Sequence, residues 1–134
     1  MNKKICIVQS TYNEDITNTL AKTASLELKN SGINKIDKIM VPGAFEIPGV
    51  IARLVQKYDG FVAIGCIIKG ETLNFDLISY SITNGIMQIS IDEKKPIGNG
   101  IITCFNKNQA MSRLDKGKEA AKAVLKVLEL KSTS

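Results

Sequence analysis

The sequence predicts an α/β fold in which a parallel sheet is covered by helices on both faces, in a single domain over residues 1–134. Three observations predict it. Four short β-rich apolar segments alternate with longer segments of helical periodicity. The central segment, residues 61–68, is almost continuously apolar, as strands buried on both faces are. No repeat, linker or low-complexity segment divides the chain.

The first strand is expected at residues 4–9, where apolar and β-branched side chains dominate. A helix is expected from residue 14 to about residue 30, because apolar side chains recur there at helical spacing. Asn13 is the expected N-cap of this helix, and the acidic residues after it favour the positive end of the helix dipole. Gly32 is expected to end the helix.

The second strand is expected at residues 36–41, ending at a Pro-Gly turn that opens a helix to about residue 58. Pro48 is compatible with the first turn of that helix. Glu46 lies in the same turn, near the sheet edge where α/β folds bind ligands. Two interpretations of Glu46 stay open: it contacts a ligand, or it only satisfies backbone N–H groups at the helix start.

The second half of the chain is expected to hold two strands and three helices: strands 61–68 and 97–104, and helices 75–92, 107–113 and 118–130. Asn106 is the expected cap of the second of these helices. The first should bury one apolar face, formed by Leu77, Ile78, Ile82, Gly85, Ile86 and Ile89. Glycines flank Asn99 in the last strand, which indicates a bulge, the close approach of a ligand or another backbone, or a weak strand segment.

Charge and composition restrict the classes of function. The net charge is +5, and the region 107–131 carries seven Lys or Arg against three acids. This excess indicates either a solvated helix face or a site for an anionic small molecule. Nucleic acid is not expected as a partner, because the chain has no block of consecutive basic residues and no Trp for base stacking.

The three cysteines, Cys6, Cys66 and Cys104, each fall within an apolar run, which predicts buried free thiols in a reducing compartment. There is no histidine and no C-x-x-C pair, so neither a zinc site nor a His-activated nucleophile is expected. No apolar stretch approaches the ~20 residues that span a bilayer, and the first residues lead directly into a strand. We therefore expect a cytoplasmic protein without a metal or a membrane contact.

A phosphate site is predicted where the central strand ends. The sequence Lys69-Gly70-Glu71-Thr72 follows the buried strand and precedes a helix. Ligands bind outside the carboxyl ends of parallel strands, and backbone N–H groups at a helix start favour anions. Gly70 lets the backbone approach a ligand closely, and Lys69 adds a positive charge.

Three local patterns carry a family resemblance: VPGAFEIP at 41–48, GCIIKGETLNFD at 65–76 and GNGIIT at 98–103. Together they resemble the 6,7-dimethyl-8-ribityllumazine synthase family, and the resemblance covers nearly the whole chain. It implies a flavodoxin-like three-layer αβα sandwich with a four-stranded parallel sheet. It also implies a homopentamer whose active sites lie between neighbouring subunits.

The resemblance further implies the reaction. Members of the family condense 5-amino-6-(D-ribitylamino)uracil with 3,4-dihydroxy-2-butanone 4-phosphate to give 6,7-dimethyl-8-ribityllumazine, the penultimate step of riboflavin biosynthesis. Phosphate and water are released, and no cofactor or metal takes part. The partners implied are these two small molecules, further copies of the chain and, as a candidate protein partner, riboflavin synthase.

The residues that match the family patterns are assigned roles by the resemblance alone. Contacts to the pyrimidine and the ribityl chain are assigned to Tyr12, Ala44, Phe45, Glu46, Cys66, Ile67 and Ile68. The phosphate is assigned to Glu71, Thr72 and Arg113, a suitable bidentate partner. Asn99 would contribute to the ring pocket of a neighbouring subunit, and Lys116 would lie in the same site.

Asn74 departs from the family, which usually has a histidine for proton transfer at this position. An amide cannot take up or release a proton near neutral pH, and a positioned acid–base group is worth about 10²–10⁴-fold in rate. Holding two reactive partners together can suffice for the condensation, or another group, such as Glu71, Asp76, water or the substrate phosphate, carries the proton. A third alternative is a non-catalytic lumazine- or flavin-binding or scaffold protein. An unrelated, monomeric flavodoxin-like phosphate-binding domain is the remaining rival.

Overall fold

A computed structural model describes residues 2–130 and shows one four-stranded parallel sheet. The strand order is β2-β1-β3-β4. The strands are β1 (Lys4–Ser10), β2 (Lys35–Val41), β3 (Gly60–Ile68) and β4 (Ile97–Cys104). All three pairings are parallel, so the carboxyl ends of the strands share one edge. The tail 131–134, expected to continue beyond the last helix, lies outside the described residues.

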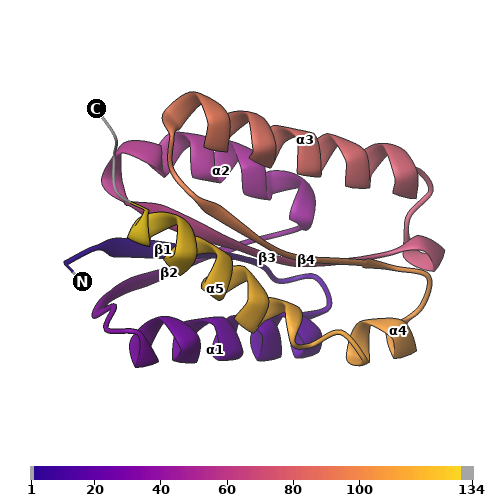
Figure 1. Cartoon of the computed structure of the whole chain (residues 1–134). Helices are drawn as coiled ribbons and strands as arrows, with labels where there is room; N and C mark the ends of the chain where they lie inside the picture. Colours follow the sequence, from indigo (N-terminus) through magenta and orange to yellow (C-terminus); the bar gives the residue numbers. More distant parts are fainter. Residues whose placement is uncertain (1, 131–134) are drawn as a thin grey trace.

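Five helices cover the sheet: α1 (Glu14–Asn30), α2 (Ile47–Leu54), α3 (Phe75–Glu93), α4 (Lys107–Met111) and α5 (Lys116–Glu129). Short 3-10 turns occur at η1 (Ala44–Glu46), η2 (Val55–Lys57) and η3 (Lys69–Glu71). Helices α1 and α5 lie on one face of the sheet, and α2 and α3 lie on the other (Figure 1). The predicted three-layer αβα sandwich is therefore confirmed.

Two apolar cores fill the space between the layers. Ile5 and Ile7 of β1 pack toward α1 and α5, whereas Cys6 and Val8 pack toward α2, as the alternation of side chains along a strand requires. Every residue of β3 is buried, because this strand is paired on both sides and covered on both faces. The three cysteines are buried and free, as the sequence predicted.

Several predicted helices differ in detail from those observed. The sequence predicted a single helix from the Pro-Gly turn to about residue 58, and this prediction is wrong. The 3-10 turns η1 and η2 flank α2. The α-helix therefore begins only at Ile47, with Pro48 in its first turn. Asn13 precedes α1, but its side chain does not cap the helix. Asn106 does cap α4, since its Oδ1 accepts the Gln109 N–H at 3.0 Å. Helix α4 ends at residue 111 and α5 begins at residue 116.

The buried face of α3 is narrower than predicted. Ile82 and Ile86 are buried, and Ile78 and Ile89 are partly buried. Leu77, expected to face inward, is 66% exposed, so that assignment is wrong. Helix α3 meets the rest of the chain along one narrow strip, and apolar residues beyond that strip face outward.

The two glycines of β4 mark a close approach of another backbone, one of the alternatives left open by the sequence. A Cβ added at Gly98 would lie 2.3 Å from the backbone oxygen of Ala120 in α5. One added at Gly100 would lie 2.8 Å from the backbone oxygen of Ala63. The pairing of β3 with β4 continues without interruption, so the strand has no bulge here.

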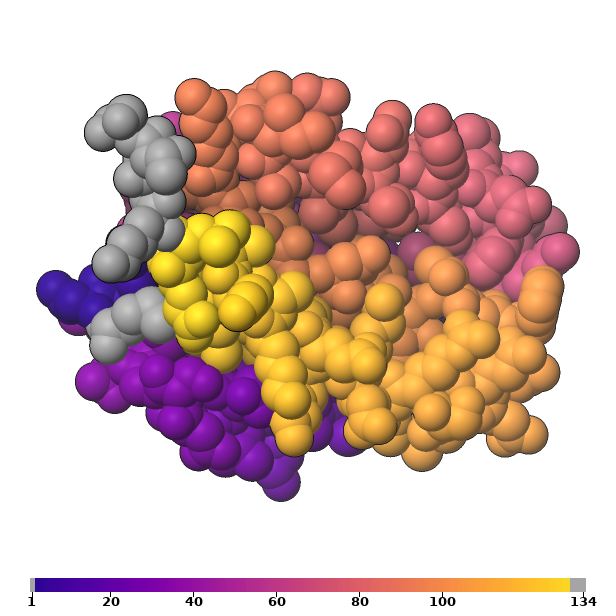
Figure 2. All heavy atoms as spheres, in the orientation of Figure 1, coloured from indigo at the N-terminus to yellow at the C-terminus, as the bar shows by residue number. Residues whose placement is uncertain are grey.

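Gly117 allows α5 to lie directly against α1, as the yellow and purple helices do in Figure 2. A Cβ at this position would lie 2.2 Å from the backbone oxygen of Leu20. We expect Gly117→Ala to lower the free energy of unfolding by about 1–3 kcal/mol, because one backbone must move. Urea denaturation measures the change. Gly49→Ala is the matched control, since nothing lies within 4 Å of its Cβ; equal stability of the two variants would contradict the expectation.

Among residues 2–130, no helix is long and apolar enough to cross a membrane.

Candidate active site

The topology places a binding edge at the carboxyl ends of β1 and β3. These two strands are neighbours, but the chain leaves β1 toward α1 on one face and leaves β3 toward α3 on the other. Their following loops therefore diverge and leave a crevice, the usual ligand site of open α/β sheets. The turn after β2 reaches the same edge, because the Thr11 and Tyr12 N–H groups donate to the carbonyls of Val41 and Pro42.

A first hollow, of about 230 Å³, opens at this crevice and is called the Tyr12 hollow below. It brings together eight of the predicted substrate residues: Tyr12, Ala44, Phe45, Cys66, Ile67, Ile68, Glu71 and Thr72. The rings of Tyr12 and Phe45 are 55% and 65% exposed, so both can cover a flat ligand. The end of β3 contributes Cys66, Ile67 and Ile68, and Gly43 and Ile78 complete the lining.

Glu46 lies beside the Tyr12 hollow without lining it. Its Oε1 accepts the Gly43 N–H at 2.9 Å and so closes the η1 turn. This contact is the backbone role that the sequence left open. The carboxylate is exposed, so it also retains free acceptor positions for a ligand.

The loop after β3 forms a wider depression of about 760 Å³ from residues 69–77. Glu71 and Thr72 line both this depression and the Tyr12 hollow. Asn74 also lines the depression; it is exposed, and its side chain does not cap α3. The predicted phosphate loop and the predicted proton-transfer position therefore adjoin one opening.

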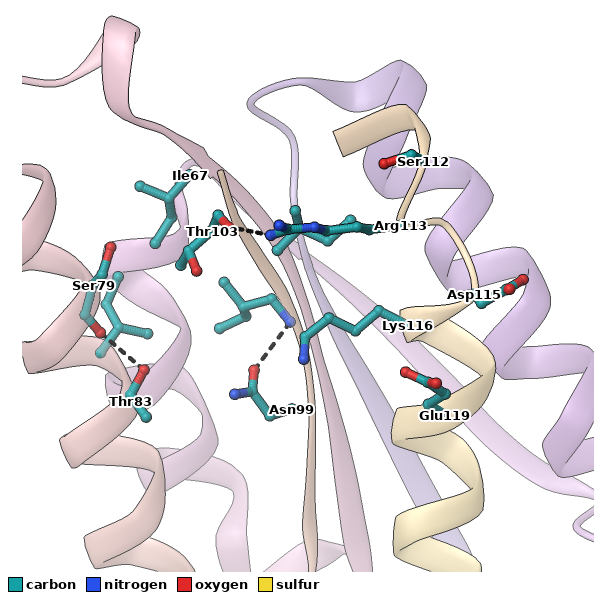
Figure 3. A pocket seen from close by; sticks show the side chains of 13 residues that line it. Ile67, Ser79, Thr83, Asn99, Thr103, Ser112, Arg113, Asp115, Lys116 and Glu119 are labelled. Carbon is teal, nitrogen blue, oxygen red and sulfur yellow. Dashed lines mark hydrogen bonds between the residues drawn. The ribbon is translucent and has the colours of Figure 1, made fainter. Parts of the chain in front are cut away.

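A second hollow, of about 460 Å³, lies between α3, β4 and α5 and is called the Arg113 hollow below (Figure 3). It contains the remaining predicted residues, Asn99, Arg113 and Lys116. The Arg113 Nη1 donates to the Thr103 carbonyl at 2.8 Å, which holds the guanidinium over the end of β4. Asn99 Oδ1 accepts the N–H of Ile101 at 3.1 Å, on the open edge of the sheet.

Six polar residues that line the Arg113 hollow were not predicted from the sequence: Ser79, Thr83, Thr103, Ser112, Asp115 and Glu119. Ser79 and Thr83 are one turn apart on α3, and the Thr83 hydroxyl donates to the Ser79 carbonyl at 2.9 Å. The Ser79 hydroxyl is buried and makes no hydrogen bond within residues 2–130. The sequence signal for Ser79 and Thr83 was their spacing of four residues, which places two side chains on the same face of a helix.

Comparison with known proteins gives the family. The family model of 6,7-dimethyl-8-ribityllumazine synthase matches residues 2–132. This chain belongs to the lumazine synthase family. It is 41% identical to the 6,7-dimethyl-8-ribityllumazine synthase of Albidiferax ferrireducens, with 96% of this chain and 85% of the relative covered. It is 44% identical to the synthase of Leuconostoc mesenteroides subsp. mesenteroides (96% and 86%) and 40% identical to that of Agrobacterium fabrum (95% and 93%).

Membership of the lumazine synthase family confirms the resemblance found in the sequence. It also rules out the unrelated phosphate-binding domain, because the family covers the chain from residue 2 to residue 132. The family fold agrees with the observed sheet and layers.

The thiols of this family member serve packing. Burial raises the pKa of the Cys66 thiol to about 12 and that of the Cys6 thiol to about 11. Both groups are therefore neutral near pH 7 and are poor nucleophiles. Among residues 2–130, no group of three or more His, Cys, Asp or Glu side chains is arranged to hold a metal ion.

The two hollows are separate within one lumazine synthase chain. Ile67 is the single residue that lines both. The structure therefore brings Tyr12 and Thr72 together, and it brings Asn99 and Arg113 together, but it does not place Arg113 beside Thr72 in one copy.

Proposed function

We propose that this protein catalyses the condensation of 5-amino-6-(D-ribitylamino)uracil with 3,4-dihydroxy-2-butanone 4-phosphate, forming 6,7-dimethyl-8-ribityllumazine and releasing phosphate and water. The observation that carries the proposal is the family match over residues 2–132. The arrangement of the Tyr12 hollow supports it, because two exposed aromatic residues lie in one opening with the end of a buried strand.

The residues act by binding and orientation in this proposal. Tyr12 stacks on the pyrimidine, and the segment 44–46 and the end of β3 contact the ribityl chain and the uracil. The phosphate binds the loop at 70–72, and Arg113 neutralises it. Lys116 lies in the same hollow as Arg113 and adds positive charge there. Two reactants held in one site gain much of the rate from their proximity.

We further propose that the protein is a homopentamer, with the Arg113 hollow of one subunit facing the Tyr12 hollow of the next. The separation of the two hollows supports a shared site. A row of exposed apolar side chains also supports self-association: Leu73, Leu77, Tyr80, Met87 and Ile91. Their spacing of four, three, seven and four residues repeats every seven and is typical of helices that pack against other helices. The number five rests on the family.

The row of apolar side chains gives a test of assembly. We expect Met87→Glu to lower the particle mass measured by light scattering, because it places a charge on the row. Ser81→Glu is the control: Ser81 is exposed on the same helix but lies outside the row. If both variants keep the mass of the unmodified protein, the row is not the contact surface. Turnover should fall together with the mass if the site is shared.

A steady-state assay tests the reaction itself. Both substrates are mixed with the protein, and lumazine formation is followed against the uncatalysed background. Turnover above the background supports the synthase. Tight binding of the pyrimidine without turnover would contradict it and favour a binding or scaffold protein. A cytoplasmic location and riboflavin synthase as a protein partner belong to the same proposal; the buried free cysteines support the former.

A further inference from the structure

Asn13 adopts an unusual backbone conformation just before α1. Its φ and ψ angles are 59° and 51°, in the left-handed region, which asparagine tolerates better than most residues. Its backbone oxygen accepts the N–H groups of Ile16 and Thr17, both at 3.0 Å. A capping side chain usually goes with an extended backbone, so in the left-handed conformation the Asn13 side chain makes no cap bond and is free to reach another segment.

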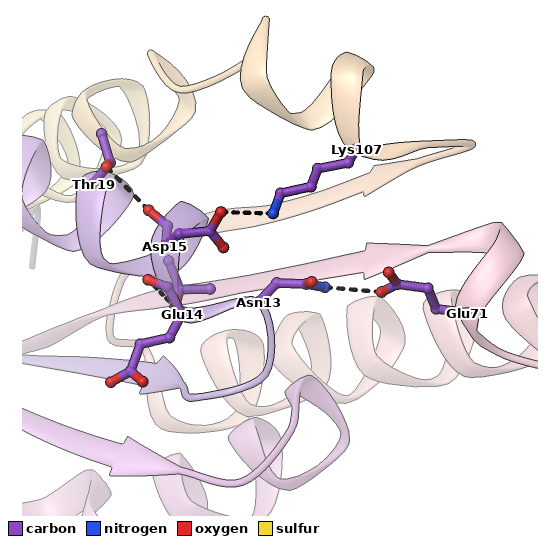
Figure 4. Close-up of polar contacts among 7 residues, drawn as sticks. Asn13, Glu14, Asp15, Thr19, Glu71 and Lys107 are labelled. Carbon is purple, nitrogen blue, oxygen red and sulfur yellow. Dashed lines mark hydrogen bonds and ion pairs between the residues drawn. The ribbon is translucent and has the colours of Figure 1, made fainter.

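The Asn13 side chain reaches the phosphate loop. Its Nδ2 donates to Glu71 Oε1 at 3.2 Å, across 58 positions of sequence (Figure 4). Glu71 belongs to η3, and Asn13 directly follows Tyr12 in the chain. The bond thus joins the residue next to the proposed stacking ring to the loop proposed to hold the phosphate.

The Glu71 carboxylate carries the same sign of charge as the substrate phosphate. The direction in which this carboxylate points therefore affects how well the loop can bind the phosphate. Two anions in contact repel each other. The bond to Asn13 draws the carboxylate toward the first turn of α1, where the helix dipole favours negative charge. Glu71 and Thr72 line the same two openings, so the direction of this carboxylate decides how near its charge lies to an anion bound by the loop.

A second interaction joins α4 to the first turn of α1. Asp15 and Lys107 form an ion pair at 2.8 Å, which ties α1 to α4 (Figure 4). The hydrogen bond with Asp15 raises the pKa of Lys107, and the charge of Glu71 raises it further. Glu71 thus accepts a hydrogen bond from the Asn13 amide, and its charge also acts on Lys107. At the other end of the loop, the Lys69 Nζ lies 5.3 Å from the Phe105 ring centroid.

We propose that Asn13 is a positioning residue whose amide holds the Glu71 carboxylate toward the start of α1, so that the 69–72 loop is set for an anion. The proposal rests on the proposed function, because it takes this loop as the phosphate loop. Asn13 acts through Glu71 and does not itself touch the phosphate. Its effect should therefore appear in the KM for the phosphorylated substrate.

The main variant is Asn13→Asp, which keeps the size of the side chain and its tolerance of the left-handed backbone. It replaces the donor by a carboxylate that faces Glu71. We expect the KM for the butanone phosphate to rise about 10-fold, as the loss of one hydrogen bond to a charged group implies. The KM for the pyrimidine should change by less than about twofold, because Tyr12 keeps its place.

The double variant Asn13→Asp with Glu71→Gln reverses the polarity of the bond. The amide introduced at position 71 can donate to the carboxylate introduced at position 13, so the KM for the butanone phosphate should return to within about threefold of its original value. Asn108→Asp is the charge control, since it adds one negative charge on exposed α4. Thermal unfolding of each variant checks that the fold is retained.

The proposal is supported if Asn13→Asp raises the KM for the butanone phosphate alone and the double variant lowers that KM again. No rise in the KM for the butanone phosphate, an equal rise for both substrates, or no rescue would each overturn it. If the unmodified protein makes no lumazine, the proposed function fails. Titration of the same proteins with inorganic phosphate then decides on Asn13: weaker binding in Asn13→Asp that the double variant restores supports its role, and unchanged binding overturns it.

Discussion

Arg113→Ala is expected to raise the KM for the butanone phosphate roughly 10- to 100-fold, the cost of losing hydrogen bonds from a charged donor. Arg113 is already held over the Arg113 hollow by its bond to the Thr103 carbonyl at 2.8 Å. The remaining guanidinium N–H groups are free to bind two phosphate oxygens. The KM for the pyrimidine should change little, because that ring is proposed to bind the Tyr12 hollow.

The measurement is a pair of steady-state titrations, one for each substrate. Arg53→Ala is the matched control, because Arg53 is the other arginine of the chain and lies exposed in the last turn of α2. Equal changes of the two KM values in Arg113→Ala would rule out a phosphate-specific role. Arg113→Lys adds a sharper test: a lysine restores the charge but not the bidentate geometry, so it should recover only part of the loss.

The sheet could be predicted from the sequence because each strand carries its own local signal. The apolar run at 61–68 is continuous enough to require burial on both faces, and the structure buries every residue of β3. The glycines beside Asn99 also gave a correct signal, since only a residue without a side chain fits where Ala120 approaches. These features depend on neighbours along the chain or on size alone.

Other features depend on packing between distant segments and could not be predicted in this way. Leu77 has the spacing of a buried residue, yet it is exposed. The apolar surface of α3 is broader than the strip that packs against the rest of the chain, and Leu77 lies outside that strip. Asn13 has the sequence context of a cap, but a left-handed backbone turns its amide to Glu71. The pattern of residue types does not record either contact.

The candidate site shows the same division. The sequence identified several residues of each hollow, but it gave no sign that Arg113 and Thr72 line different openings of one chain. That separation follows from the strand order. Strand β4 lies at the edge of the sheet, and together with α3 and α5 it lines the Arg113 hollow. The sequence thus supplies the chemical groups, and the topology decides which hollow each of them lines.

Asn74→His is expected to raise kcat, by an amount bounded by the roughly 10²–10⁴-fold value of a positioned acid–base group. Asn74 is exposed and lines the depression formed by residues 69–77, so an imidazole there has room and access to the reactants. The chain has no histidine, and burial raises the pKa of Cys66 to about 12. The unmodified protein therefore has no imidazole for proton transfer, and the Cys66 thiol stays protonated near neutral pH.

The pH profile of kcat separates proton transfer from a simple change in packing. A catalytic imidazole has an ordinary pKa near 6.5, so the Asn74→His variant should gain an inflection close to that value that the unmodified protein lacks. The rate should fall below the inflection if the imidazole acts as a base and above it if the imidazole acts as an acid. Asn108→His, outside all three openings, is the control for an added histidine. A loss of rate without a new inflection would show that the site is built around the amide, and that another group carries the proton.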